Sequence, residues 1–65
     1  MRTLKNMMVE GIEFEVYSDY EDGVGKWYTF DNDKLDIHGS VLANDKDWAA
    51  YYFALSDPML DYLSR

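Results

Sequence analysis

The sequence contains no cysteine and only one histidine, His38. The absence of cysteine excludes disulfide bonds, thiolate-bound zinc and thiol redox chemistry, and it is typical of proteins in a reducing compartment. A zinc site built from several histidines is excluded as well. We therefore expect a cytoplasmic protein without a metal ion or other cofactor.

Long apolar segments are also missing. The longest uninterrupted apolar run covers eight residues, 48–55, whereas a membrane-spanning helix needs about 20. Arg2 and Lys5 near the N-terminus are not followed by an apolar run of the length found in signal peptides. Because the chain begins at Met1 and its length suits one domain, we expect a complete, soluble, intracellular gene product with a single domain, residues 1–65.

Basic residues are few, six against thirteen acidic ones, and the formal net charge is −7. Residues 10–22 contain no Lys or Arg but six acids, which are Glu10, Glu13, Glu15, Asp19, Glu21 and Asp22. The same stretch contains Ile12, Phe14 and Val16, which indicates folded structure and not a solvated tail. Such a negative surface repels nucleic acid and anionic membranes and attracts basic protein surfaces. We expect neither direct nucleic-acid binding nor membrane binding.

Hydrophobic periodicity predicts an α+β fold, in which an antiparallel sheet of three or four strands is followed by a C-terminal helix packed on one face. Period-two alternation and strand-forming side chains predict three strands, over Thr3–Val9, Ile12–Tyr20 and Lys26–Phe30. A short fourth strand is expected from Leu35 to His38, and it fades at Gly39-Ser40. Turns are expected at Glu10-Gly11, Asp22–Gly25 and Asp31–Lys34. The helix is expected from about Asp45 to Leu55, with Asn44 or Asp45 as its cap, and a break at Ser56-Asp57-Pro58 precedes a last turn over Met59–Leu63.

The loop length sets the register of the second and third strands. A two-residue turn at Asp22-Gly23 would pair Val16 with Thr29, whereas a loop with an odd number of residues pairs Val16 with Phe30 and keeps apolar side chains together. We expect the odd loop, with Ser18 opposite Tyr28 and one glycine in a bulged or left-handed position. The opposite face then contains Glu13, Glu15, Tyr17, Asp19, Trp27 and Thr29.

The expected helix is apolar on every side, although a helix on a small sheet needs one apolar stripe. Spacings of three and four favour a sheet-facing stripe of Trp48, Tyr52, Leu55 and Met59. The side chains left over, Tyr51, Phe53 and Ala54, then form an apolar surface. A 65-residue domain buries only about 60% of its unfolded surface, so we expect a homodimer through this surface. The alternative is a monomer in which Met59, Leu60 and Leu63 fold back as a lid.

No catalytic motif is present. A calcium loop that starts at Asp31 needs Gly at its sixth position and Glu at its twelfth, but these are Asp36 and Leu42. No serine lies in a Gly-x-Ser-x-Gly context and His38 has no adjacent nucleophile. So small a chain also has little room for a pocket of about 300 Å³. We therefore expect a protein that is not an enzyme.

The acidic strand has two interpretations. It is either the solvated outer face of a sheet or an imitation of a nucleic-acid backbone, because alternate strand residues lie about 6.6 to 6.8 Å apart, comparable with one phosphate step along a wound strand. In the second interpretation Tyr17 and Trp27 are aromatic anchors. The partner-binding acids are Glu13, Glu15, Asp19, Glu21 and Asp22, with a second cluster of Asp31, Asp33 and Asp36.

In size and composition the whole chain resembles small, cysteine-free, acidic and aromatic-rich products of phages and mobile elements. These include anti-CRISPR proteins, anti-restriction DNA mimics and uracil-DNA glycosylase inhibitors. The resemblance implies a non-enzymatic inhibitor, in the host cytoplasm if phage-encoded, that binds a basic, nucleic-acid-binding surface of a host or defence protein. The alternative is a small structural or regulatory adaptor, such as an assembly factor or antitoxin, that binds its partner through the aromatic helix.

Overall fold

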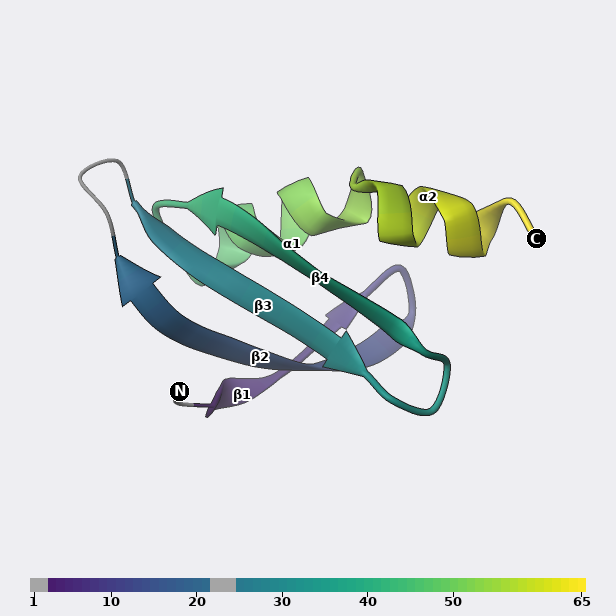
Figure 1. The fold of residues 1–65 in the computed structure, drawn as a ribbon, viewed down its shortest axis with the longest axis horizontal. Coiled ribbons are helices and arrows are strands. Elements are labelled where there is room, and N and C mark those ends of the chain that lie inside the picture. Colours follow the sequence, from purple (N-terminus) through teal and green to yellow (C-terminus); the bar gives the residue numbers. More distant parts are fainter. Residues whose placement is uncertain (1–2, 22–24) are drawn as a thin grey trace.

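The computed structural model describes the backbone of residues 3–21 and 25–65 and the side chains of residues 6–18 and 25–65. A four-stranded antiparallel sheet with strand order β1-β2-β3-β4 is covered on one side by two helices (Figure 1). The strands are β1 (Thr3–Val9), β2 (Ile12–Glu21), β3 (Lys26–Asn32) and β4 (Ile37–Ala43), and the helices are α1 (Lys46–Ala54) and α2 (Asp57–Leu63). The predicted α+β fold is confirmed. Neither helix has the length and apolar character needed to cross a membrane.

Glu10 and Gly11 alone connect β1 to β2, and both have positive φ angles, 53° and 78°. Two consecutive positive φ angles are typical of the tight hairpin turn whose twist matches that of the flanking strands. The predicted turn is therefore present. Gly11 adopts this conformation without a steric penalty, whereas Glu10 adopts it as a non-glycine residue.

The predicted register between β2 and β3 is confirmed, because Val16 lies opposite Phe30 and Ser18 lies opposite Tyr28. The register then shifts by one residue before Tyr20, which lies opposite Trp27. The extra residue is therefore Asp19, within β2. The four residues 22–25 separate the two strands, so the expectation of a loop with an odd number of residues is wrong, and Asp19 produces the register instead. The prediction of a bulged or left-handed glycine concerned Gly23 or Gly25, and Gly23 lies outside the described residues.

Strand β4 begins later and extends further than the sequence predicted. Leu35 and Asp36 belong to the preceding turn, where the Leu35 N–H donates a hydrogen bond to Oδ1 of Asn32 (2.8 Å) and Asp36 has a φ of 57°. The strand continues through Gly39, where a Cβ atom would lie only 2.9 Å from Cε1 of Phe53. Gly39, which suggested the end of the strand, is thus the position at which the side chain of Phe53 contacts β4.

The helix boundaries follow the predicted capping signals. Oδ1 of Asp45 accepts a hydrogen bond from the Trp48 N–H (2.9 Å), which caps α1. Helix α2 starts again after Ser56 with Pro58 in its first turn. Helix α1 packs against β4, β1 and β3, and α2 packs against β4.

The core lies between the sheet and the helices and is centred on three phenylalanines. Phe53 stacks on Phe30 with ring centroids 4.6 Å apart and an interplanar angle of 7°, and it meets Phe14 edge-on at 5.1 Å. The residues buried in this core are Val9, Phe14, Val16, Tyr28, Phe30, Ile37, Ala43, Ala49, Phe53 and Met59.

The predicted orientation of α1 is wrong. Phe53, expected on the free surface, is fully buried, and Ala54 packs against the core, whereas Trp48, Tyr52 and Leu55 are exposed. Because α1 is apolar on all sides, residue spacing does not distinguish one face from another. The small Ala49 lets the helix approach the sheet, and Phe53 then fits against Phe14 and Phe30.

Of the predicted surface of Tyr51, Phe53 and Ala54, only Tyr51 is exposed. The lid alternative is also corrected. Met59 is buried, as its place in the sheet-facing stripe required, but Leu60 and Leu63 are half exposed and Tyr51 is uncovered.

Replacement of Phe53 by Ala is expected to reduce the free energy of unfolding by about 3–5 kcal/mol, because it leaves a cavity between Phe14 and Phe30. Tyr51→Ala on the solvent side of the same helix should change it by about 0.5 kcal/mol or less. Urea unfolding measures both. Phe53→Leu, a milder truncation, serves if the alanine variant does not fold, and equal effects at positions 51 and 53 would contradict the observed orientation of α1.

Candidate functional site

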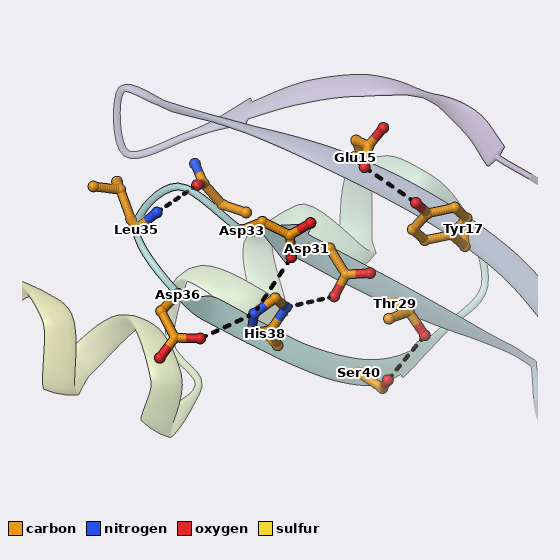
Figure 2. Close-up of polar contacts among 10 residues, drawn as sticks. Glu15, Tyr17, Thr29, Asp31, Asp33, Leu35, Asp36, His38 and Ser40 are labelled. Carbon is orange, nitrogen blue, oxygen red and sulfur yellow. Dashed lines mark hydrogen bonds and ion pairs between the residues drawn. The ribbon is translucent and has the colours of Figure 1, made fainter.

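A row of polar side chains crosses the outer face of the sheet, opposite the helices. Asn6 of β1 lies opposite Glu15 of β2, Glu15 lies opposite Asp31 of β3, and Asp31 lies opposite His38 of β4. Figure 2 shows Glu15, Asp31 and His38 on this face. Each strand thus contributes one residue, because the register that pairs the apolar residues inward also aligns these four outward.

Four carboxylates surround a hollow of about 420 Å³ on this face. We call Glu13, Glu15, Asp31 and Asp33 the acidic face. The other residues that line the hollow are Asn6, Phe14, Asn32 and Lys34. The expectation of little room for a pocket of about 300 Å³ is therefore wrong. Four acids and one lysine give this hollow a net negative charge, which attracts positively charged groups.

Glu15 and Asp31 are directly opposite each other on neighbouring strands. Like charges in this arrangement destabilise a sheet. The two glutamates of the acidic face, Glu13 and Glu15, accept hydrogen bonds from neutral groups. Asn6 Nδ2 donates to Glu13 Oε2 (3.3 Å), and Tyr17 Oη donates to Glu15 Oε1 (3.2 Å). Among the side chains of residues 6–18 and 25–65, no Lys or Arg forms an ion pair with either glutamate. A cation from another molecule would relieve this repulsion.

His38 brings together the three aspartates of the predicted second cluster. Nδ1 of His38 lies 2.9 Å from Oδ1 of Asp31, and Nε2 lies 3.3 Å from Oδ1 of Asp36 and 3.7 Å from Oδ1 of Asp33 (Figure 2). A neutral imidazole has a single N–H, whereas the protonated ring donates from both nitrogens. The hydrogen bond to Asp31 raises the pKa of His38 above its ordinary value of 6.5, and the charges of Asp31 and Asp33 and the contact with Asp36 also raise it, against the opposing effect of desolvation.

The structure assembles much of the predicted site. Glu13, Glu15, Tyr17, Trp27 and Asp31 lie on the outer face of the sheet, and Asp33 and Asp36 lie in the turn beside it. The side chains of Asp19 and Glu21, and the whole of Asp22, lie outside the described part of the chain. Within that part, no group of three or more His, Asp or Glu residues is arranged to hold a metal ion.

Sequence reasoning missed Asn6, Lys34 and the role of His38. The alternation of residues in β3 and β4 predicts that His38 lies near Asp31 only if the length of the turn between the two strands is known. The position of Asn6 opposite Glu15 similarly depends on the register of β1, which is set by the two-residue turn at Glu10-Gly11.

A second feature lies on the helix layer. Trp48, Tyr51 and Tyr52 of α1 form an aromatic cluster with ring centroids 5.8 to 5.9 Å apart. Their exposed fractions are 53%, 57% and 44%, and Leu55 beside them is also exposed. Large apolar side chains grouped on a surface are typical of interaction sites.

Comparisons with protein-family models, with curated proteins and with solved structures find no match to this chain. The geometry of the acidic face and of the aromatic cluster is therefore the basis for a functional proposal.

The pKa of His38 should exceed 6.5 in the folded protein, and Asp31→Asn should lower it, because the substitution removes the carboxylate that accepts the strongest hydrogen bond. Titration of the imidazole C–H resonances by NMR measures both values. Asp61→Asn, far from His38 on α2, is the control and should leave the titration unchanged.

The raised pKa also predicts a pH-dependent contribution to stability. Protonated His38 stabilises the fold fully below the unfolded pKa of about 6.5, and this contribution disappears as the pH rises through the higher folded pKa. Urea unfolding from about pH 5.5 to about pH 8.5 should show the wild type losing its advantage over His38→Gln towards high pH. A constant difference would contradict the interaction with the aspartates.

Proposed function

We propose that the protein is a non-enzymatic inhibitor whose acidic face binds a basic, nucleic-acid-binding surface of another protein. The apposition of Glu15 and Asp31 supports this proposal most directly. The two carboxylates face each other beside a hollow that also contains Glu13 and Asp33, and the only basic side chain that contacts either of them in the described part of the chain is His38, 2.9 Å from Asp31. An arginine or lysine from a partner would neutralise this charge, and arginine can bind a carboxylate through two parallel hydrogen bonds.

The arrangement of the charges supports a nucleic-acid-binding partner. Neighbouring strands lie about 4.8 Å apart and alternate residues along a strand about 6.7 Å apart, so the backbone positions that carry these acids are spaced comparably with one phosphate step along a wound strand. A protein surface that contacts phosphates provides several basic side chains at matching intervals. Occupation of that surface by the acidic face would exclude nucleic acid and thereby inhibit the partner.

Aromatic side chains flank the charges. Tyr17 donates its hydroxyl hydrogen bond to Glu15 on the same face, and Trp27 lies further along β3 with part of its indole exposed. Tyrosine and tryptophan are common among residues that provide most of the binding energy at interfaces. They give the acidic face apolar contact area that charges alone lack.

The double variant Glu13→Lys, Glu15→Lys should reduce affinity for the captured partner at least 30-fold, equivalent to about 2 kcal/mol. Asp57→Lys, Asp61→Lys on α2 changes the net charge by the same amount on the helix layer and is the matched control. Partner capture from the source cell, followed by calorimetry at several salt concentrations, measures the difference. Wild-type affinity should also fall steeply with salt.

Two results would contradict the proposal. Unchanged affinity of a folded Glu13→Lys, Glu15→Lys variant would exclude the acidic face. Equal losses in both double variants would mean that net charge, and not this face, determines binding.

The alternative function, a small structural or regulatory adaptor, is supported by the exposed aromatic cluster of Trp48, Tyr51 and Tyr52. This cluster belongs to the helix layer, so it is separate from the acidic face (Figure 1). A partner that is lost with Tyr51→Lys and retained by Glu13→Lys, Glu15→Lys would identify the adaptor function.

A further inference from the structure

The aromatic cluster borders a hollow of about 370 Å³ on the solvent side of α1, lined by Asp47, Trp48 and Tyr51. The rings of Trp48 and Tyr51 are almost perpendicular, at 89°, with centroids 5.8 Å apart. Tyr52 lies beside both, 5.8 Å from Trp48 and 5.9 Å from Tyr51. The hollow is therefore lined by aromatic side chains in two orientations and by one acidic residue, Asp47.

These walls select for a cation. The faces of aromatic rings carry negative electrostatic potential and attract positive groups placed over them, tryptophan most strongly. Asp47 adds a full negative charge in the same place, and the whole protein carries a net charge of −7. A positively charged ligand is thus favoured at the hollow over a neutral apolar one of the same shape.

Arginine fits this combination better than lysine. Its guanidinium group is planar and weakly hydrated, so it can stack on an indole such as that of Trp48, and its fork of N–H donors matches the geometry of a carboxylate such as that of Asp47. A lysine ammonium is more strongly hydrated and offers no flat surface to the ring.

A second copy of the chain is a poorer occupant. Two copies would each bring a net charge of −7, which opposes self-association. The area is also small. Aromatic side chains bury about 150–250 Å² when fully covered, so the half-exposed cluster together with Leu55 offers roughly 400 Å² per copy. The resulting total of roughly 800 Å² is below the 1,200 Å² or so of a stable interface.

We propose that the hollow between Asp47, Trp48 and Tyr51 binds an arginine side chain of a basic partner protein. This inference rests on the adaptor function and does not depend on the acidic face. It identifies the chemistry that the aromatic cluster recognises and adds a cation-binding site on the layer opposite the sheet.

The test uses three blocked pentapeptides, glycine throughout except for a central arginine, lysine or citrulline, titrated into the full-length protein by NMR. The arginine peptide should shift the Trp48 indole N–H saturably. The citrulline peptide, which has the same shape without the charge, should bind at least fivefold more weakly, and the lysine peptide should lie between them. Residue-specific signals separate this site from the acidic face, because binding there would shift Trp27 and His38.

Variants locate the interaction. Asp47→Asn should weaken arginine binding at least threefold, and Tyr51→Phe, which keeps the ring face, should retain it within twofold. Trp48→Ala should abolish the saturable shifts of the backbone amides of α1. Glu13→Lys, Glu15→Lys should leave all of them unchanged.

Equal binding of the arginine and citrulline peptides would overturn the arginine proposal but leave the cluster as an adaptor surface. Absence of binding by all three peptides would also overturn it, and the adaptor function would then depend on the Tyr51→Lys capture result alone. A dimer held through Trp48 and Tyr51, detected by sedimentation and abolished by Tyr51→Glu, would overturn it in favour of a second copy.

Discussion

The stacked contact between Phe53 and Phe30 joins the helix layer to the sheet, and the remaining packing depends on it. Phe14 meets Phe53 from the neighbouring strand, Ala49 lets α1 lie close to the sheet, and Gly39 leaves room for the edge of the Phe53 ring. A small domain has little apolar area to bury, and here the buried residues form one core between these two layers. The outer faces of both layers are therefore free to carry residues that do not stabilise the fold.

The packing of the core also determines which residues make up the acidic face. In an antiparallel sheet, neighbouring residues along a strand point to opposite sides, so the register that buries Val16 against Phe30 also places Glu15 opposite Asp31. A shift of one residue would separate the two carboxylates, but it would also expose the core side chains. The like-charge contact is thus retained because the core requires this register, and His38 partly compensates it by hydrogen bonding to Asp31.

The sequence predicted those features that local patterns determine. Alternating apolar residues identified β2 and β3 and their register, and the capping residues Asn44-Asp45 and Pro58 marked the starts of the helices. The orientation of α1 was not predictable from its spacing, because the helix is apolar on every side and the choice between Phe53 and Tyr52 depends on the shape of the opposing sheet. The extent of β4 was missed for a related reason, since Gly39 is required by its contact with Phe53 and not by a turn. The contact of His38 with three aspartates depended in turn on the position of β4.

The two candidate surfaces have different geometrical consequences for a partner. The acidic face belongs to the sheet and the aromatic cluster to the solvent side of the helix layer, in a molecule whose shortest Cα extent is 15 Å. A flat basic surface contacts only one of them, and the other then stays available to a second protein. A narrow cleft with basic walls on both sides can contact both at once, with carboxylates on one wall and aromatic rings beside Asp47 on the other. Both proposals assign cations to these surfaces, so under them the shape of a basic partner, and not its charge alone, would determine whether one partner encloses the protein or two partners share it.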